Sequence, residues 1–185
     1  MKEFWDFDEN INFIEVIINN KKYKVLYKYT DSSQSANILV QLDITLFLIC
    51  NYLSTNKYKY SKEERNAIEC FLDVHFNNKK TSLAEMQIGT IFNGLNKPRD
   101  IIKTNKPYIG EDKNIRAKYR TVFLTLRKKN GKFKSNKSIM DLFIHEITHS
   151  MCNHISWRDD DHGEDFKKYE KLLSEVLLKI NSDYS

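Results

Sequence analysis

The sequence holds little of what marks a secreted, modular or low-complexity protein. Its 185 residues include three cysteines, two prolines and five glycines. Cys50, Cys70 and Cys152 are odd in number and far apart, which argues against a disulfide framework and favours reduced thiols. The scarcity of proline and glycine argues against long linkers between separate units. We therefore expect a single domain, residues 1–185, that is long enough to bury its own hydrophobic core.

The sequence also shows no pattern typical of a targeting segment or of a membrane span. The first ten residues, MKEFWDFDEN, are acidic where a secretory signal is basic, and no apolar segment follows them. The longest predominantly apolar run, Ile44–Cys50, is far shorter than the ~20 residues that a helix needs to cross a bilayer. We expect an intracellular protein, cytoplasmic or nuclear, that makes no contact with a membrane.

The charge balance is mildly basic. Lysine and arginine exceed aspartate and glutamate by five, and lysine accounts for 24 of the 30 basic residues. Together with 18 asparagines, this lysine bias is typical of an AT-rich genome, so it does not by itself indicate a surface that binds polyanions. The sequence contains no zinc finger, no helix-turn-helix signature and no aromatic-basic repeat, which argues against nucleic-acid binding as the main function.

Local patterns predict an α+β domain in which helices predominate and the sheet is small. Two β-prone runs, Phe13–Ile18 and Lys22–Tyr29, flank Asn19-Asn20, a sequence typical of a hairpin turn. A further strand is expected at Tyr119–Arg127, which is rich in β-branched and aromatic residues. The stretch Asn96–Lys118 contains both prolines and a glycine, and it predicts a long irregular connection.

Five helices are expected from apolar residues at helical spacing and from capping residues. Ser61 and Glu64 have the spacing of a capping box at the start of the second helix. His75, near the end of that helix between apolar neighbours, is expected to be structural. The five helices run from Asp31–Ser33 to about Ser54, from Ser61 to about Phe76, from Ser82 to about Leu95, from Ser135 or Ser138 to about Met151, and from Glu164 to about Ile180.

One short motif carries the chemistry. His145-Glu146-Ile147-Thr148-His149 has the form HExxH and falls on the fourth expected helix. Histidines four positions apart lie on one face of a helix, so His145 and His149 can bind the same metal ion. Glu146 is turned about 100° from His145, beside the metal, where it can act as a general base. The apolar neighbours predict a largely buried helix, on which ionisable side chains are costly unless something compensates them.

A catalytic zinc site takes three protein ligands and leaves one position open, so the motif needs a third ligand. We favour His162, which precedes the last expected helix, because a helix packed against the HExxH helix presents its first turn to the metal. His154 lies half a turn out of phase with His145 if the motif helix continues. The alternatives to His162 are His154 and the glutamates Glu164, Glu170 and Glu175.

These segments resemble a known family. HEITHS followed at short distance by HGEDF is similar to the HExxH…HGxxF signature of the WLM and SprT-like metallopeptidases, and the resemblance is greatest to the WLM-like metallopeptidases of large DNA viruses. In that group a strand ending in LR, an NG turn and a polar stretch precede the motif helix, as Phe123–Arg127, Asn130-Gly131 and Ser138–His149 do here. The resemblance is specific over residues 119–177 and faint over residues 11–118.

The resemblance implies a mostly helical, zincin-like α+β fold with a small sheet bordering the HExxH helix. It implies a zinc-dependent endopeptidase, with His145, His149 and His162 as metal ligands and Glu146 as the catalytic base. Relatives act on proteins crosslinked to DNA, so the implied partners are a protein or peptide substrate and DNA bound through the basic surface. If the protein is viral, its location is the host cell. The alternative function is a zinc-binding scaffold or interaction protein with little turnover.

Two further features concern the substrate and the metal. In a zincin the strand before the motif helix borders the cleft, and an extended substrate pairs with its edge, so we expect Tyr119–Arg127 to take this place. The oxyanion-stabilising group is His154, Arg158 or Tyr169, and the sequence leaves this choice open. The acidic run Asp159–Asp161, immediately before His162, departs from the family pattern and adds negative charge near the metal.

Overall fold

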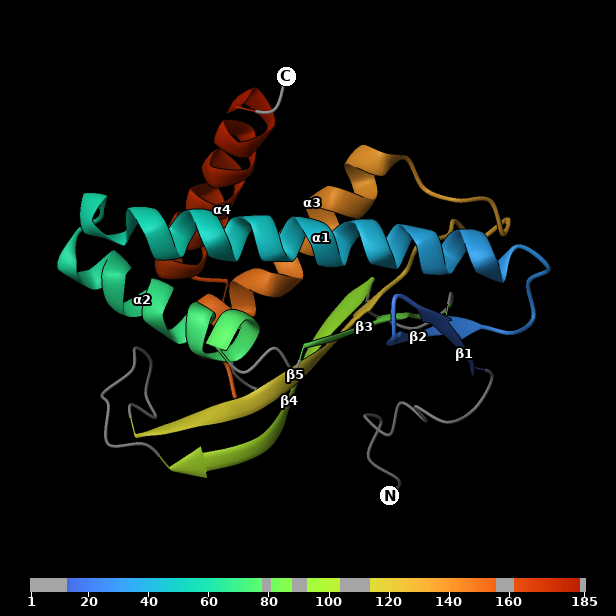
Figure 1. Cartoon of the computed structure of the whole chain (residues 1–185), viewed down its shortest axis with the longest axis horizontal. Coiled ribbons are helices and arrows are strands. Elements are labelled where there is room, and N and C mark those ends of the chain that lie inside the picture. Colours follow the sequence, from blue (N-terminus) through green and yellow to red (C-terminus); the bar gives the residue numbers. More distant parts are fainter. Residues whose placement is uncertain (1–12, 78–80, 88–92, 104–113, 156–161, 184–185) are drawn as a thin grey trace.

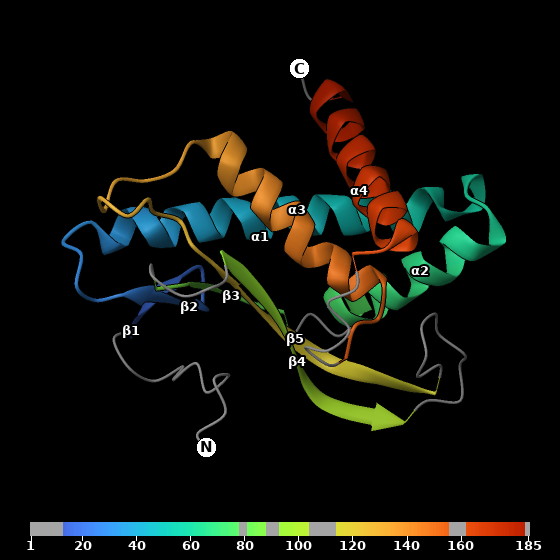
Figure 2. The same ribbon diagram turned by 180° about the vertical axis from the view of Figure 1, so that it is seen from behind.

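The computed structural model describes residues 13–77, 81–87, 93–103, 114–155 and 162–183. In this part of the chain a five-stranded sheet lies on one side and the helices on the other (Figure 1 and Figure 2). The strands are β1 (Phe13–Ile18), β2 (Lys21–Leu26), β3 (Ser82–Glu85), β4 (Gly94–Lys103) and β5 (Ile115–Leu124). The helices are α1 (Ser32–Asn56), η1 (Lys57–Lys59), α2 (Lys62–Leu72), η2 (Asp73–Asn77), α3 (Asn136–Met151) and α4 (Glu164–Asp183). The predicted α+β class is confirmed, with a larger sheet than expected.

The sheet has the strand order β1-β2-β3-β5-β4. Its inner pairs, β2 with β3 and β3 with β5, are parallel, and the two outer pairs are antiparallel. Asn19 and Asn20, with φ angles of 50° and 61°, form the predicted hairpin turn between β1 and β2. β5 lies between β3 and β4 and has no free edge over Thr121–Leu124. The expectation that Tyr119–Arg127 offers its edge to a substrate is therefore wrong, because β4 is the outer strand.

Two segments fold differently from the prediction. β3 and the start of β4 replace the two ends of the helix expected from Ser82 to Leu95, of which residues 88–92 lie outside the described residues. The β4–β5 hairpin occupies much of the supposedly irregular stretch Asn96–Lys118. Residues 104–113 of that stretch lie outside the described residues. Leu83 and Ala84 favour a helix by propensity, but burial between β2 and β5 outweighs that preference. Pro98 is tolerated in β4 because this strand lies at the edge of the sheet.

The helices pack on the sheet through a continuous hydrophobic core. α2 begins with the predicted capping box, in which the side chain of Ser61 accepts from the N–H of Glu64 at 3.3 Å and Glu64 accepts from the N–H of Ser61 at 2.8 Å. Every α-helix and the inner strands contribute fully buried side chains to the core, among them Val25, Leu39, Ile49, Phe71, Val122, Phe143 and Leu173.

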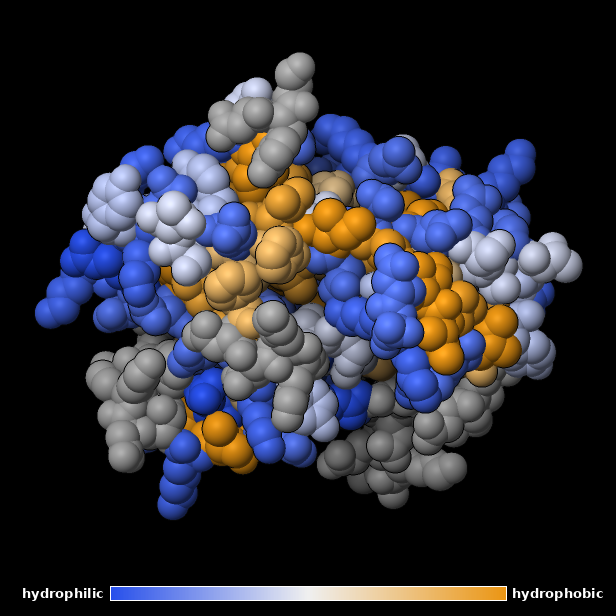
Figure 3. Space-filling view, in the orientation of Figure 1, coloured by the Kyte–Doolittle hydropathy of each residue, from blue (hydrophilic) through white to orange (hydrophobic). Residues whose placement is uncertain are grey.

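α1 exposes apolar side chains on the face that points away from this core. Ile44 and Phe47 are exposed, and Figure 3 shows hydrophobic side chains gathered across the face that α1 crosses in Figure 1. By length and composition the segment Ser32–Lys59 is apolar enough to cross a membrane, and the core helix of a soluble protein passes the same test. The expected absence of a membrane span therefore stays a prediction.

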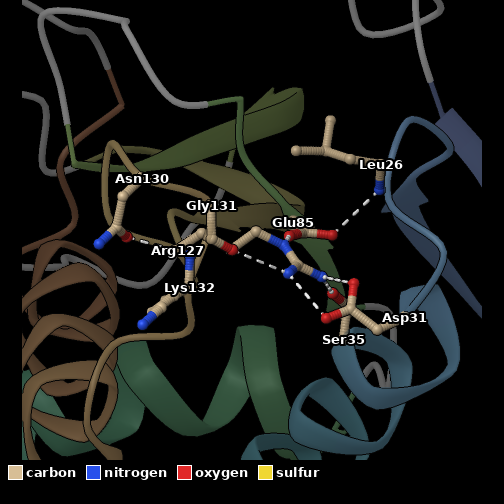
Figure 4. A network of polar contacts seen from close by, with 8 residues as sticks. All are labelled: Leu26, Asp31, Ser35, Glu85, Arg127, Asn130, Gly131 and Lys132. Carbon is tan, nitrogen blue, oxygen red and sulfur yellow. Dashed lines mark hydrogen bonds and ion pairs between the residues drawn. The ribbon is translucent and has the colours of Figure 1, made fainter.

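A buried arginine joins several segments beside the sheet. Arg127 donates from Nε to Glu85 on β3 at 2.9 Å and from a terminal nitrogen to Asp31, before α1, at 2.8 Å (Figure 4). Its guanidinium also stacks between the rings of Tyr29 and Phe133, 4.0 and 3.9 Å from their centroids. These contacts fix the segment that leads from β5 into α3 relative to β3 and α1.

Candidate metal centre

α3 carries the HExxH sequence and is held by its N-terminal cap and by its apolar face. The side chain of Ser135 accepts from the N–H of Ser138 at 3.2 Å. Ile139, Phe143 and Ile147 lie in the core, at the spacing of one helical face. The two histidines of the motif are half-buried on another face, at the C-terminal end of the helix.

His145, His149 and His162 converge. One ring nitrogen of each lies within 4.8 Å of the corresponding atoms of the other two. The ring centroids are 4.8 Å apart for His145 and His162, 5.3 Å for His149 and His162, and 5.5 Å for His145 and His149. Nitrogens that share one tetrahedral ion lie about 3.4 Å apart, so small side-chain rotations suffice to bind it. The structure thus brings together the three predicted ligands in a group that could hold a metal ion.

The position of His162 follows from the packing of α4. His162 lies two residues before the first residue of α4, and Phe166, in the first turn, is buried. The ring of Phe166 packs against all three imidazoles, with centroids 5.0 Å from His145, 4.8 Å from His149 and 4.5 Å from His162. An aromatic side chain in the core therefore fixes the start of α4 beside the motif helix, as predicted.

A carboxylate orients the first histidine. Oε1 of Glu170, one turn after Phe166 on α4, lies 2.8 Å from Nδ1 of His145. This contact leaves Nε2 of His145 for a metal and fixes the orientation of the ring, as carboxylates behind metal-binding histidines do. Glu170, one of the alternative third ligands, thus supports a ligand. Glu164 and Glu175, the other two, lie outside the group of convergent ligand atoms in the described part of the chain.

His154 reaches the site because α3 ends at Met151, two residues past the motif. Asn153 adopts a left-handed conformation, with φ of 55°, and ends the helix. The N–H of His154 then donates to the carbonyl oxygen of His149 at 3.0 Å, and Nδ1 of His154 lies 2.8 Å from Nδ1 of His149. A metal on Nε2 of His149 leaves the proton on Nδ1, so His149 would donate and His154 accept. The expectation that His154 lies half a turn out of phase with His145 holds only if α3 continues. It does not apply here, because the backbone turns at Asn153.

Burial keeps His149 neutral. Desolvation, followed by the effect of the neighbouring His154 and His145, lowers the pKa of His149 to about 2. The neutral imidazole is the form that binds a metal ion, so the surroundings of His149 favour binding over protonation.

Glu146, the residue after His145, is buried on a turn of α3 that is bonded to the sheet. Asn96 on β4 donates from Nδ2 to the carbonyl oxygen of Glu146 at 2.5 Å and to the hydroxyl of Ser150 at 2.8 Å. Arg120 on β5 donates in turn to Oδ1 of Asn96 at 3.2 Å. The hydrogen bonds fix α3 against β4 at the turn that carries the predicted general base.

Of the three candidates for oxyanion stabilisation, the structure places one at the site. Tyr169 is buried on α4, and its hydroxyl donates to Glu63 on α2 at 3.3 Å. Arg158 lies outside the described residues, as does the acidic run Asp159–Asp161. His154, bonded to a ligand histidine, is the candidate that remains beside the metal ligands.

The sequence reasoning missed the residues that support the ligands from behind. Arg120 is fully buried and donates to the carbonyl oxygen of His154 at 2.6 Å as well as to Asn96. A signal for it exists, because the alternation of β5 places Arg120 on the same face as the core residues Val122 and Leu124. A charge at such a position indicates a buried partner. Asn96 shows no such local signal, since its partners on α3 lie 50 and 54 residues away and Arg120 lies 24 residues away.

Comparison with known proteins identifies no relative. The chain matches no protein-family model, no curated protein and no solved structure. The resemblance to the WLM and SprT-like metallopeptidases therefore rests on the sequence segments around His145 and His162.

Proposed function

We propose that the protein is a zinc-dependent endopeptidase of zincin-like fold, in which His145, His149 and His162 bind the metal and Glu146 is the general base. The observation that carries the proposal is the convergence of three imidazoles from α3 and from the start of α4, with a buried carboxylate adjacent on α3. Three imidazoles are a donor set that zinc favours, and they leave a coordination position for water or substrate.

The chain's own residues supply the proton transfer and the rigidity. Zinc held by these histidines would polarise the scissile carbonyl and lower the pKa of a water molecule. Glu146 accepts a proton from the attacking water and gives it to the nitrogen of the leaving amine as the C–N bond breaks. Glu170 and His154 hold the rings of His145 and His149 from behind, which limits their rotation during the reaction.

β4 is the strand with which an extended substrate can pair. Among the described residues no strand pairs with its outer side. The hydrogen bond from Asn96 to the backbone of Glu146 shows that the first half of β4 lies beside the catalytic turn of α3. Backbone pairing with β4 would lead a peptide past the metal ligands whatever its side chains, as an endopeptidase requires.

Proteins bound to DNA are the substrate class that we propose. Arg120 and Arg116 are turned inward, and the buried guanidinium of Arg116 lies 4.0 Å from Asp73. Besides these two, β4 and β5 carry four basic residues, Lys97, Arg99, Lys103 and Lys118, and one acidic residue, Asp100. This hairpin extends away from the helices (Figure 1). DNA should stimulate the cleavage of a bound protein at low salt, and the stimulation should fade as salt rises, because phosphate contacts release counterions. Equal rates with and without DNA at low ionic strength would exclude DNA as a tether.

The activity is tested by metal analysis together with cleavage of casein and histones. The purified protein should hold about one zinc ion per chain. A chelator should abolish cleavage, and added zinc should restore it. Cleavage that persists after the metal is removed would contradict a zinc peptidase. A zinc-loaded protein that cleaves neither substrate would favour the zinc-binding scaffold instead.

A further inference from the structure

Gly94, the first residue of β4, lies directly against the side chain of Glu146. A β-carbon at residue 94 would stand 2.7 Å from Cδ and 2.8 Å from Cγ of Glu146, closer than real Cβ atoms approach other heavy atoms. The backbone does not require glycine here, because the φ angle of Gly94 lies outside the left-handed region in which Gly131, with φ of 81°, is found. Residue 94 is therefore suited to glycine because the side chain of Glu146 occupies the space that a β-carbon would need.

β4 and α3 are held together and cannot easily separate to make room for a larger side chain at residue 94. Gly94 pairs with Leu124 in the β4–β5 ladder. Two residues along β4, Asn96 is buried and bonded to α3 at both Glu146 and Ser150. The strand and the helix are thus held together within one helical turn of the contact. A close-packed contact of this kind absorbs an added methyl group only by displacing a side chain or the backbone.

We propose that Gly94 is a positioning residue, which fixes the Glu146 carboxylate against the backbone of β4. The inference rests on the proposed function where it takes Glu146 to be the general base, and the packing claim is independent of any activity. With a side chain at residue 94, the carboxylate must turn away from the strand. The three heavy atoms nearest to the added β-carbon all belong to Glu146, so Gly94→Ala should leave His145 and His149 in place.

The packing claim is tested by introducing Gly94→Ala into two backgrounds, the wild type and Glu146→Ala. In the wild type, Gly94→Ala should lower the Tm of the zinc-loaded protein by several degrees, because the new methyl group meets the carboxylate. With Glu146→Ala the space is empty, and the same change should leave the Tm unchanged or raise it, since alanine restricts the unfolded chain more than glycine does. An equal loss of Tm in both backgrounds would overturn the proposal.

The positioning role is tested by the kinetics of the same variant. Gly94→Ala should retain about one zinc ion per chain and the wild-type KM for a peptide, while kcat falls about 100-fold, as a displacement of ~1 Å in a catalytic group can cause. Adding Gly94→Ala to Glu146→Ala should lower kcat no further, because the group that it displaces is gone. An unchanged kcat in Gly94→Ala, or equal losses in both backgrounds, would overturn the role.

Gly131→Ala is the matched control. It adds the same methyl group to a glycine far from α3's catalytic turn, where the nearest atom is Cε1 of Tyr29 at 3.5 Å and the positive φ strains alanine. It should lower the Tm equally whether residue 146 is glutamate or alanine, and it should leave kcat unchanged. A fall in kcat for Gly131→Ala would show that lost stability alone explains the effect of Gly94→Ala, which would overturn the positioning role.

Discussion

Nδ1 of His145 on α3 and a carboxylate oxygen of Glu170 on α4 lie 2.8 Å apart. The contact joins the motif helix to the helix that His162 precedes, and it leaves Nε2 of His145 for a metal. Phe166, one turn before Glu170, packs against the same rings. The segment from His162 to Glu170 therefore contributes three groups to the proposed metal site: a proposed ligand just before α4, and a buried ring and a carboxylate on α4.

Removing the carboxylate of Glu170 should weaken zinc binding without abolishing it. Glu170→Ala should lower zinc affinity about 10- to 100-fold, because His145 loses the partner that fixes its ring and its tautomer. The measurement is a competition titration against a chromogenic chelator. Glu175→Ala is the control, since Glu175 lies on the same helix, forms an exposed ion pair with Lys171 at 3.9 Å and lies outside the histidine group. Equal affinities for the two variants would show that Glu170 has no role in metal binding.

Replacing His162 should affect zinc binding more than replacing His154, because we propose that His162 binds the metal and that His154 only orients His149. His162→Ala should lose zinc as severely as His149→Ala, because each removes one of three metal bonds. His154→Ala should keep zinc with affinity lowered about tenfold, because it removes only the acceptor behind His149. Zinc content after dialysis measures both. Retention of zinc by His162→Ala, with loss in His154→Ala, would exchange the two assignments.

The Arg127 contacts should dominate the stability of the region between β3 and α1. Arg127→Met should cost about 3–5 kcal/mol in the free energy of unfolding, because it leaves Glu85 buried without its counter-charge. Lys137→Met, which breaks an exposed pair with Asp141 at 3.2 Å, should cost less than about 0.5 kcal/mol. Urea unfolding measures both changes. Similar losses in the free energy of unfolding for the two variants would mean that the buried Arg127–Glu85 pair stabilises the fold no more than an exposed pair does.

His75 should make the fold sensitive to acid. Burial, with a smaller effect of Arg120, lowers the pKa of His75 to about 3, whereas the unfolded chain has a value near 6.5. Between these values the unfolded state binds the extra proton, so stability falls as pH drops from about 6.5 towards 3, by up to about 1.4 kcal/mol per pH unit. His75→Gln removes the titrating group and should flatten this part of the curve. Zinc release affects both proteins and cancels in the comparison, so parallel curves would contradict the buried, neutral His75.

The sequence predicts the site where local geometry determines it. The spacing of His145 and His149 on a helix is sufficient to place both rings on one face, and the position of His162 before an amphipathic helix suggested its role. The support behind these ligands depends on tertiary packing. The sequence predicts Glu170 only as an alternative ligand and does not predict its place behind His145. His154 reaches the site through the left-handed turn at Asn153, which the phase of a continuing helix does not predict.

The fold, too, is predicted correctly where local sequence signals determine it and wrongly where tertiary packing does. The β1–β2 turn and the capping box at Ser61 are local signals, and both predictions are confirmed. β3 and β4 were predicted wrongly, because Leu83 and Ala84 favour a helix while their burial between two other strands selects a strand. Without β4, the sequence assigns the free edge of the sheet to β5, which is an inner strand. The contacts that Gly94 and Asn96 on β4 make with α3 are then not predicted either.

Zinc content and turnover of Glu146→Gln, measured on the same preparation, test the central claim most directly. The amide occupies nearly the same volume as the carboxylate but cannot accept the proton. The variant should therefore hold about one zinc ion per chain and keep the wild-type Tm, while kcat for casein falls about 10²- to 10⁴-fold. Wild-type turnover in the zinc-loaded variant would contradict the account.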